Sequence, residues 1–325
     1  MTKEITFEEV SSFLSGRDPM ERIISIECGY DDNEVSIIFV NEKGEKRVKK
    51  DAFKPFVWVK QSAAASLFEG KRHTLVSKLN RYGIWVKKLD MGVDEGIANE
   101  RLKNGFGYIF YARKKMSYKT FMRFFTEGGV PIYTKKKKGE EDRSSKNKDY
   151  ISVSPVEQYM IQTGKRLFKG YESYDELNRF VFDLETQGLN PKYHRIEQIG
   201  MRTNKGFEKV VSVEGSTEEE LDKSEINGID EFLRTIAELK PDTVVGHNSE
   251  NFDWDFLIQR CEILGYNFSE MSLKYFRHPI FKKKKETVLK LGGEVEYYFP
   301  TIMWGFNIID SLHAARRAQA IDSNM

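Results

Sequence analysis

The fold is decided by the stretch Arg179-Phe180-Val181-Phe182-Asp183-Leu184-Glu185-Thr186, in which an apolar lead-in ends in two carboxylates. Positions i and i+2 of a β-strand point to the same face, so Asp183 and Glu185 converge on one point. Further along the chain, Gly246-His247-Asn248-Ser249-Glu250-Asn251-Phe252-Asp253 follows an apolar run and ends where a helix is expected to begin. Three carboxylates brought together attract hard divalent cations, and two such cations cleave phosphodiesters. The pattern therefore predicts a nuclease or a proofreading part of a larger enzyme.

The Asp183/Glu185 pair has a plain alternative, because most Asp-x-Glu sequences are simply exposed surface carboxylates. Here the pair ends an apolar strand and is followed by the tight exit Thr186-Gln187-Gly188-Leu189. Two carboxylates on a mostly buried strand repel each other and lose hydration unless a cation compensates them. We therefore favour metal binding over a surface role.

The composition limits the class of protein. Of the 325 residues, 39% are hydrophobic and 13% aromatic, so a large core is expected and wholesale disorder is not. The 52 Lys and Arg residues nearly balance the 50 acidic residues, which predicts local charged patches. The two cysteines, Cys28 and Cys261, offer neither metal-ligand spacing nor a disulfide framework. No apolar signal core and no membrane-spanning run occur, so we expect a soluble cytoplasmic protein, in the host cytoplasm if the chain is viral.

The first part of the chain, residues 1–150, is predicted to be a β-rich domain. Residues 23–28 and 35–40 flank an Asp31-Asp32-Asn33 turn, which indicates a hairpin. A second reversal is expected at 42–45, strands at 56–59 and 84–89, short helices at 63–67 and 75–82, and a helix at 117–125. Residues 151–178 are interpreted as a linker.

Residues 179–325 are expected to form a second domain of a different kind. Strands are predicted at 179–185, 196–202, 209–213 and 243–246, and helices at 229–239 and 253–264, with Gly265 as a helix stop. Three strands, a helix, a strand and a helix follow the order of a ribonuclease-H-like sheet. The fold class is therefore α/β and α+β, a ribonuclease-H-like domain after a β-rich one. Residues 288–299 are predicted to be a hairpin with a Gly-Gly turn.

Several polar residues of the second motif have two interpretations. Asn248 could cap the following helix or contact a substrate, and Phe252 could belong to the core or pack on a terminal base. His247 is interpreted as a structural histidine. Asp310, at the end of a predicted strand, is interpreted as a helix cap and not as a metal ligand.

Two basic runs each have two interpretations, a solvated loop or a phosphate-contacting surface. The first covers residues 135–148 and the second residues 282–285, where four lysines follow aromatic side chains. Aromatic residues beside lysines are typical of surfaces for single-stranded nucleic acid.

These residues resemble the 3′→5′ exonuclease region of family B DNA polymerases. The first exonuclease motif of that family resembles residues 183–186, and the second resembles residues 246–253, continuing through Leu257 and Arg260. The strand that ends at Asp310 resembles the strand after the family's hairpin insertion, and the first 150 residues are similar to its amino-terminal domain. The linkers are most similar to polymerases of large tailed bacteriophages.

The resemblance implies a set of site residues, cofactors and partners. It implies Asp183, Glu185 and Asp253 as catalytic residues and metal ligands, and Asn248, Phe252, Leu184 and Thr186 as substrate contacts. One Mg²⁺ or Mn²⁺ ion held by Asp183 and Asp253 would activate water, a second held by Asp183 would stabilise the leaving 3′ oxygen, and Glu185 would orient the water. The implied partners are DNA (a single-stranded primer 3′ end and template), the downstream polymerase part and replication accessory proteins, with no membrane.

The chain departs from this family in two respects. The third exonuclease motif, Tyr-x-x-x-Asp, is missing, because Ala318 stands four residues before Asp322. The palm motifs of the polymerase are missing too. We therefore expect the amino-terminal part of a DNA-directed DNA polymerase, truncated or split, that cleaves poorly by itself. The alternatives are a free-standing 3′→5′ exonuclease and a non-catalytic subunit that clamps DNA or docks a partner.

Overall fold

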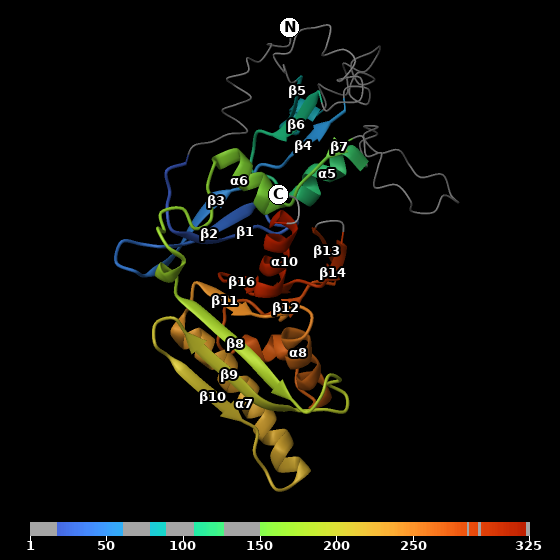
Figure 1. Cartoon of the computed structure of the whole chain (residues 1–325). Helices are drawn as coiled ribbons and strands as arrows, with labels where there is room; N and C mark the ends of the chain where they lie inside the picture. The colour runs from blue at the N-terminus through green and yellow to red at the C-terminus, as the bar shows by residue number, and fades with distance from the viewer. Residues whose placement is uncertain are drawn as a thin grey trace, which may run out of the picture. The chain divides into compact units, whose positions relative to one another are not determined.

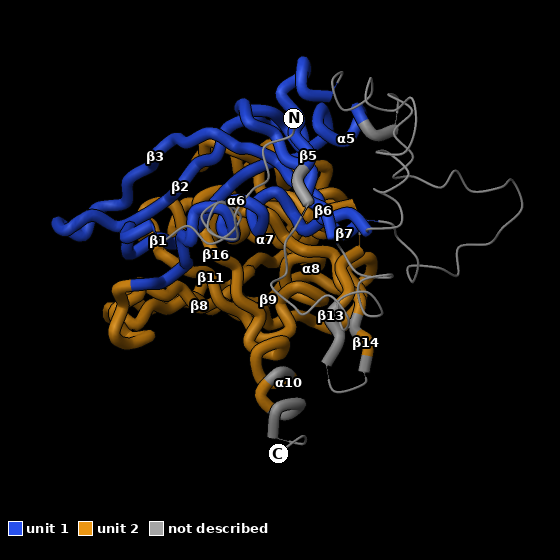
Figure 2. Tube along the Cα trace, turned by 90° about the horizontal axis from the view of Figure 1, so that it is seen from above, with its two compact units in different colours: residues 1–169 blue, residues 170–325 orange. Residues whose placement is uncertain are grey.

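A computed structural model describes residues 18–60, 79–88, 107–126, 150–284, 286–291 and 294–322 of the chain. The chain divides into two compact units, residues 1–169 and 170–325 (Figure 2). The predicted helix at 63–67, the basic run at 135–148 and the Gly-Gly turn at 292–293 lie outside the described residues. The division falls inside the segment 151–178 that we interpreted as a linker, so the predicted domain limits stay a prediction.

Unit 1 contains two antiparallel sheets. The first has the order β1-β2-β3, with β1 at Ile23–Glu27, β2 at Glu34–Val40 and β3 at Lys46–Ala52. The second has the order β5-β6-β4-β7, with β4 at Phe56–Val59, β5 at Ile84–Lys88, β6 at Tyr108–Ala112 and β7 at Tyr150–Ile151. The predicted hairpin around residues 31–33 is confirmed, since Ile26 lies opposite Ile37.

Unit 1 also contains helices, and residues 79–81, within the predicted helix at 75–82, are helical. Helix α5 at Tyr118–Thr126 confirms the prediction at 117–125. Helix α6 at Pro155–Thr163 was missed, because residues 151–178 were interpreted as a linker. Its start signal is present in the sequence: Ser154 and Glu157 form a reciprocal capping box, and Pro155 occupies the first turn.

Unit 2 is built on a mixed five-stranded sheet with the order β10-β9-β8-β11-β16 (Figure 1). The strands are β8 at Arg179–Thr186, β9 at Ile196–Thr203, β10 at Glu208–Ser212, β11 at Thr243–Gly246 and β16 at Asn307–Asp310. β9 runs antiparallel to its two neighbours β8 and β10, whereas β11 is parallel to both β8 and β16. The carboxyl ends of β8, β11 and β16 therefore meet at one edge. The first predicted motif ends at this edge, and the second begins there.

Helices α7, at Glu218–Leu239, and α8, at Asp253–Ile263, lie on one face of this sheet. The short α9 spans Phe268–Ser272. Phe182 of β8 packs with ring centroids 5.0 Å from both Phe232 of α7 and Trp254 of α8, so both helices cover the Phe182 side of the sheet. Figure 1 shows them together behind the β8–β10 strands.

The remaining elements follow α9. A two-residue pair, β12 at Phe281–Lys282 with β15 at Thr301–Ile302, encloses the antiparallel hairpin of β13 at Thr287–Leu291 and β14 at Glu294–Tyr298. This confirms the predicted hairpin pairing. α10 at Ser311–Asp322 follows β16. No helix among the described residues is both long and apolar enough to cross a membrane.

Candidate functional site

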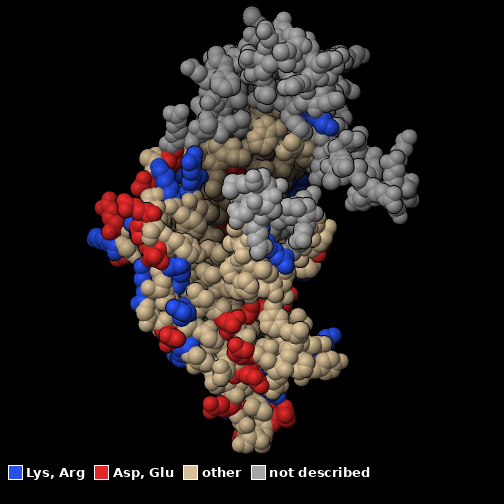
Figure 3. Space-filling model, viewed as in Figure 1, with Lys and Arg blue, Asp and Glu red and all other residues tan. Residues whose placement is uncertain are grey.

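The strand β8 separates a buried face from an open one. Phe180, Phe182 and Leu184 are at most 6% exposed and belong to the core. Asp183 and Glu185 alternate with them and are exposed on the opposite face. The prediction that the two carboxylates share a face is therefore confirmed, but the interpretation of a mostly buried strand is wrong. Acidic side chains gather over these strands on the face of unit 2 shown in Figure 3.

Asp253 supplies a buried carboxylate beside this open face. It is the first residue of α8, is 2% exposed, and its Oδ1 accepts the Leu184 N–H at 3.2 Å. Burial, and after it the negative charge of Asp183, raises the pKa of Asp253 to about 7. The structure thus brings Asp183 and Asp253, which are far apart in the sequence, close enough for the charge of Asp183 to raise the pKa of Asp253.

The oxygen ligands near Asp253 bear on whether a divalent cation could bind here. Among the residues that the structure describes, no three His, Cys, Asp or Glu side chains are grouped closely enough to hold a metal ion. Asp183 and Asp253 nevertheless have the chemistry of such a site, because they are oxygen ligands whose mutual repulsion a cation would offset. Glu185 lies on the same face as Asp183 and is the third candidate ligand.

A tight loop carries the chain from β11 to α8. A Cβ on Gly246 would lie 2.4 Å from the Ser249 Cβ, so only glycine fits there. Asn248 adopts a left-handed φ of 59°. Its side chain is not the helix cap, because Phe252 is the N-cap residue of α8 and no side chain caps it. The capping interpretation of Asn248 is therefore wrong, and its substrate contact stays a prediction.

The other predicted substrate residues differ in their surroundings. Phe252 is partly buried and packs on Phe256, with ring centroids 5.4 Å apart, so its core interpretation agrees with the structure. The Leu184 side chain lies in the core, which leaves its backbone facing the site. The Thr186 hydroxyl donates to Gly188 O at 3.0 Å. His247 is exposed, with Nδ1 at 3.0 Å from the Ser311 Oγ.

Asp310 caps α10, as the sequence predicted, because its Oδ1 accepts the Leu312 N–H at 2.9 Å. It also accepts two N–H groups from the β11–α8 loop that sequence reasoning missed. Asn248 N–H donates to Oδ1 at 2.9 Å, and Glu250 N–H donates to Oδ2 at 3.0 Å. Nothing in the sequence near Asp310 signals these bonds, since they depend on the parallel pairing of β11 with β16.

A second unpredicted network surrounds the Glu250 side chain. Glu250 is 6% exposed, and its Oε2 accepts the N–H and the hydroxyl of Thr301 at 2.9 and 2.7 Å. Burial raises the pKa of Glu250 against the lowering effect of these two bonds. Lys282 lies 3.0 Å from Asp255 and 3.8 Å from Glu250 and is mostly buried. Both interpretations of residues 282–285, an exposed loop and a phosphate-contacting run, are therefore wrong for Lys282.

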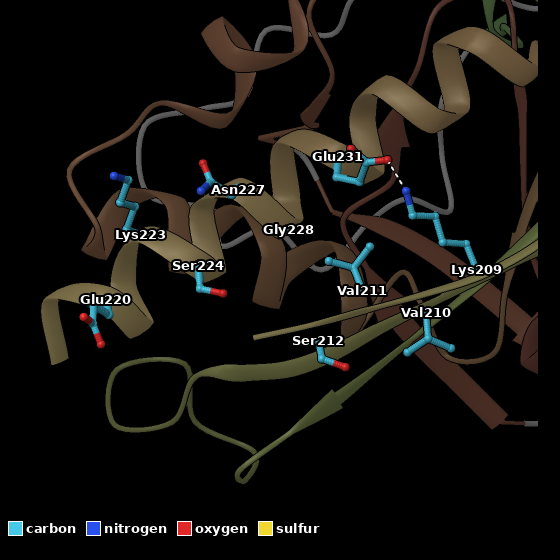
Figure 4. Close-up of a pocket in the computed structure, with 10 residues that line it drawn as sticks. All are labelled: Lys209, Val210, Val211, Ser212, Glu220, Lys223, Ser224, Asn227, Gly228 and Glu231. Carbon is cyan, nitrogen blue, oxygen red and sulfur yellow. Dashed lines mark hydrogen bonds and ion pairs between the residues drawn. The ribbon is translucent and has the colours of Figure 1, made fainter. Parts of the chain in front are cut away.

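Two surface hollows lie away from these carboxylates. One, of about 510 Å³, runs between β10 and α7 (Figure 4). Lys209 of β10 and Glu231 of α7 form an ion pair of 2.5 Å across it. The other, of about 620 Å³, lies between the β8–β9 loop and the helices α7 and α8. Neither is lined by Asp183, Glu185 or Asp253, so the candidate site is the open strand face and not one of these hollows.

This part of the chain is similar to known proteins. Residues 140–291 match the family model described as DNA polymerase family B, exonuclease domain. This stretch is similar to that domain. The DNA polymerase of Thermococcus kodakarensis is 30% identical over 141 residues, which are 38% of this chain and 8% of that protein. DNA polymerase 2 of Aeropyrum pernix is 28% identical over 93 residues, 27% of this chain and 11% of that protein.

A solved structure extends the likeness in fold to most of the chain. The family B DNA polymerase from Pyrobaculum calidifontis matches with a TM-score of 0.52 and 16% identity, over 89% of this chain and 36% of that one. This match shows the fold alone: β-rich amino-terminal sheets followed by a mixed sheet like that of the exonuclease region. The matched segments span a small part of the curated relatives. These relatives are archaeal polymerases, so the likeness to bacteriophage enzymes stays a prediction.

Proposed function

We propose that unit 2 is a ribonuclease-H-like 3′→5′ exonuclease domain that removes nucleotides from the primer end of DNA in a DNA-directed DNA polymerase. The observation that carries the proposal is the buried Asp253 carboxylate beside Asp183, within the segment that matches the family B exonuclease domain. The strand order β10-β9-β8-β11-β16 supports the ribonuclease-H-like assignment, because the three antiparallel strands precede the two parallel ones along the chain.

The roles of the residues follow from their positions. Asp183 and Asp253 would hold two divalent cations, Mg²⁺ or Mn²⁺, which supply an activated water and offset charge on the leaving oxygen. Glu185, on the same face as Asp183, accepts a hydrogen bond from the attacking water and orients it. Asn248, Phe252, Thr186 and the backbone of Leu184 surround the terminal nucleotide in this proposal.

The experiment is digestion of a 5′-labelled single-stranded DNA with Mg²⁺ or Mn²⁺. The wild type is compared with the Asp183→Ala/Glu185→Ala double variant, each with and without the product of the adjacent downstream reading frame. Glu208→Ala is the matched control, because Glu208 is an exposed carboxylate on β10 of the same sheet. We expect cleavage to fall by at least about 100-fold in the double variant and to persist in Glu208→Ala.

The outcomes separate three functions. Cleavage that requires the downstream product and both carboxylates supports a proofreading polymerase. Cleavage by the 325 residues alone that is lost in the Asp183→Ala/Glu185→Ala variant supports a free-standing exonuclease. If no condition gives cleavage that depends on Asp183 and Glu185, the nuclease proposal is overturned, and cation-independent DNA binding would then favour a clamping subunit.

A further inference from the structure

Asp310 does more than a helix cap requires. A cap on α10 needs one bond, the one that Leu312 N–H donates to Oδ1 at 2.9 Å. The same carboxylate also accepts N–H groups from Asn248 and Glu250, at 2.9 and 3.0 Å, which lie in another segment of the chain. Asp310 is only 6% exposed, so these three donors satisfy a charge that is nearly withdrawn from water.

The loop that binds Asp310 is linked by its own backbone hydrogen bonds to the first turn of α8. Asn248 O accepts the N–H groups of Asn251 and Phe252 at 3.1 and 3.0 Å, and Ser249 O accepts the Trp254 N–H at 3.0 Å. The close approach of Gly246 to Ser249 leaves no room for a Cβ at the start of the loop. A shift of Asn248 would therefore be passed on to the residues that begin α8.

The end of this chain of bonds is the Asp253 carboxylate. Its Oδ1 accepts the Leu184 N–H at 3.2 Å, one residue after Asp183. The paired register of β8 with β11 ends at Val181 and Val245, so Asp253 meets β8 beyond the end of the strand pairing. The position of Asp253 against β8 thus depends on the loop and not on the sheet ladder.

We infer that Asp310 is a positioning residue, which fixes the Asn248–Phe252 loop so that the Asp253 carboxylate is delivered to β8 beside Asp183. Its consequence for cleavage rests on the proposed function, whereas its consequence for the position of Asp253 does not. Glu250 assists from the other side, because its backbone N–H binds Asp310 and its side chain binds Thr301.

The test is hydrogen–deuterium exchange of single amides by NMR in the 325-residue chain without divalent cations. The Leu184 amide reports whether Asp253 is in place, and the Phe232 amide in the core of α7 reports global opening. In Asp310→Asn, an amide oxygen can replace Oδ1, but an amide nitrogen faces the Glu250 N–H. We expect Leu184 exchange to rise roughly tenfold relative to Phe232, the effect of one lost buried hydrogen bond.

Asp242→Asn is the matched control. Asp242 is 7% exposed and accepts the Asn178 N–H at 2.8 Å at the amino end of β11, so it is a buried backbone-binding aspartate at the opposite end of the strand. We expect its variant to leave Leu184 exchange unchanged relative to Phe232. Equal Leu184 protection in the wild type and in Asp310→Asn would overturn the inference, as would a selective rise in Asp242→Asn.

A kinetic readout distinguishes this inference from the proposed function. In digestion of the 5′-labelled single strand, we expect Asp310→Asn to lower kcat at least about tenfold while KM for DNA changes less than about twofold. If Asp183→Ala keeps full cleavage, the proposed function fails, and the exchange measurement still decides the role of Asp310. If Asp183→Ala abolishes cleavage while Asp310→Asn keeps both wild-type kcat and wild-type Leu184 exchange, only the positioning role fails.

Discussion

The carboxyl end of β16 and the amino end of α8 each bury an aspartate. The two carboxylates differ in the hydrogen-bond donors and charges around them. Asp310 is 6% exposed and accepts three backbone N–H groups. Asp253 is 2% exposed, its carboxylate accepts backbone N–H groups of Leu184 and of Asp253 itself, and it faces the charge of Asp183. Carboxylates of similar burial therefore differ in their surroundings: Asp310 accepts three backbone N–H groups, whereas burial and the charge of Asp183 oppose the ionisation of Asp253.

The largest expected effect contrasts the removal of the two carboxylates. Asp310→Ala leaves one buried and two part-buried N–H groups without this acceptor, so we expect it to lower the free energy of unfolding by about 2–5 kcal/mol. Asp253→Asn removes an uncompensated charge, so we expect it to change stability by less than about 1 kcal/mol, or to raise it, without divalent cations. Urea unfolding at pH 8 in EDTA measures both. Equal losses in the two variants would break the comparison.

The pH dependence of stability sharpens the same contrast. The folded pKa of Asp253 is raised from 3.8 to about 7, so the folded state keeps a proton that the unfolded chain has lost between these values. The contribution of Asp253 to stability is therefore fully present below about pH 4, falls as the pH rises to about 7, and is constant above it. We expect a fall of roughly 2–4 kcal/mol in EDTA from this group.

The control for this pH effect is Asp253→Asn, which cannot lose a proton. Urea unfolding of the wild type and the variant is compared from pH 4 to pH 8. The difference in unfolding free energy between the two proteins should change with pH over this range. A difference that stays constant would show that Asp253 is charged in the folded protein, and the contrast with Asp310 would disappear.

Alanine substitutions at two glycines measure how closely the β11–α8 loop is packed. Gly246→Ala places a Cβ 2.4 Å from the Ser249 Cβ, so the loop must move, and we expect a loss of about 1–3 kcal/mol. Gly200→Ala is the matched control, because its Cβ would meet only Asp183 O, at 3.8 Å, in the middle of β9. We expect its effect to stay within about 0.5 kcal/mol. Thermal unfolding compares them, and equal losses would show that the loop is not tightly packed.

The smallest expected effect concerns Glu250, another buried carboxylate of the same loop. Thr301→Val removes the hydroxyl that donates to Glu250 at 2.7 Å and keeps the backbone N–H donor. We expect a loss of about 1 kcal/mol in urea unfolding, less than in Asp310→Ala. A loss as large as that of Asp310→Ala would mean that Thr301, and not Asp310, is the main anchor of the loop.

The sequence predicts most of the elements that form the site. Alternation along residues 179–186 and the short apolar run before Gly246 predict β8 and β11 to within a residue, and Gly265 marks the end of α8. The start of α7 was missed by eleven residues, from 229 to 218, although Thr217 and Glu220 form a capping box. That half of the helix is largely polar, so apolar periodicity did not reveal it.

The arrangement of the carboxylates was harder to predict. The two motifs, each after an apolar run, predicted that Asp183 and Asp253 lie close together. The bonds from Asp310 to Asn248 and Glu250 require the exact pairing of Gly246 with Asp310, a register that no local pattern specifies. The partners of Lys282 likewise come from separate segments, so a lysine run alone could not distinguish phosphate contact from a buried ion pair.

The hollow between β10 and α7 bears on self-association (Figure 4). β10 is the outermost strand of its sheet, and outermost strands can recruit strands of other molecules into aggregates. The Lys209–Glu231 ion pair crosses the space beside it, and Glu208 adds another charge on the strand. An incoming strand would have to dehydrate these groups, so this edge should keep the domain dispersed at high protein concentration.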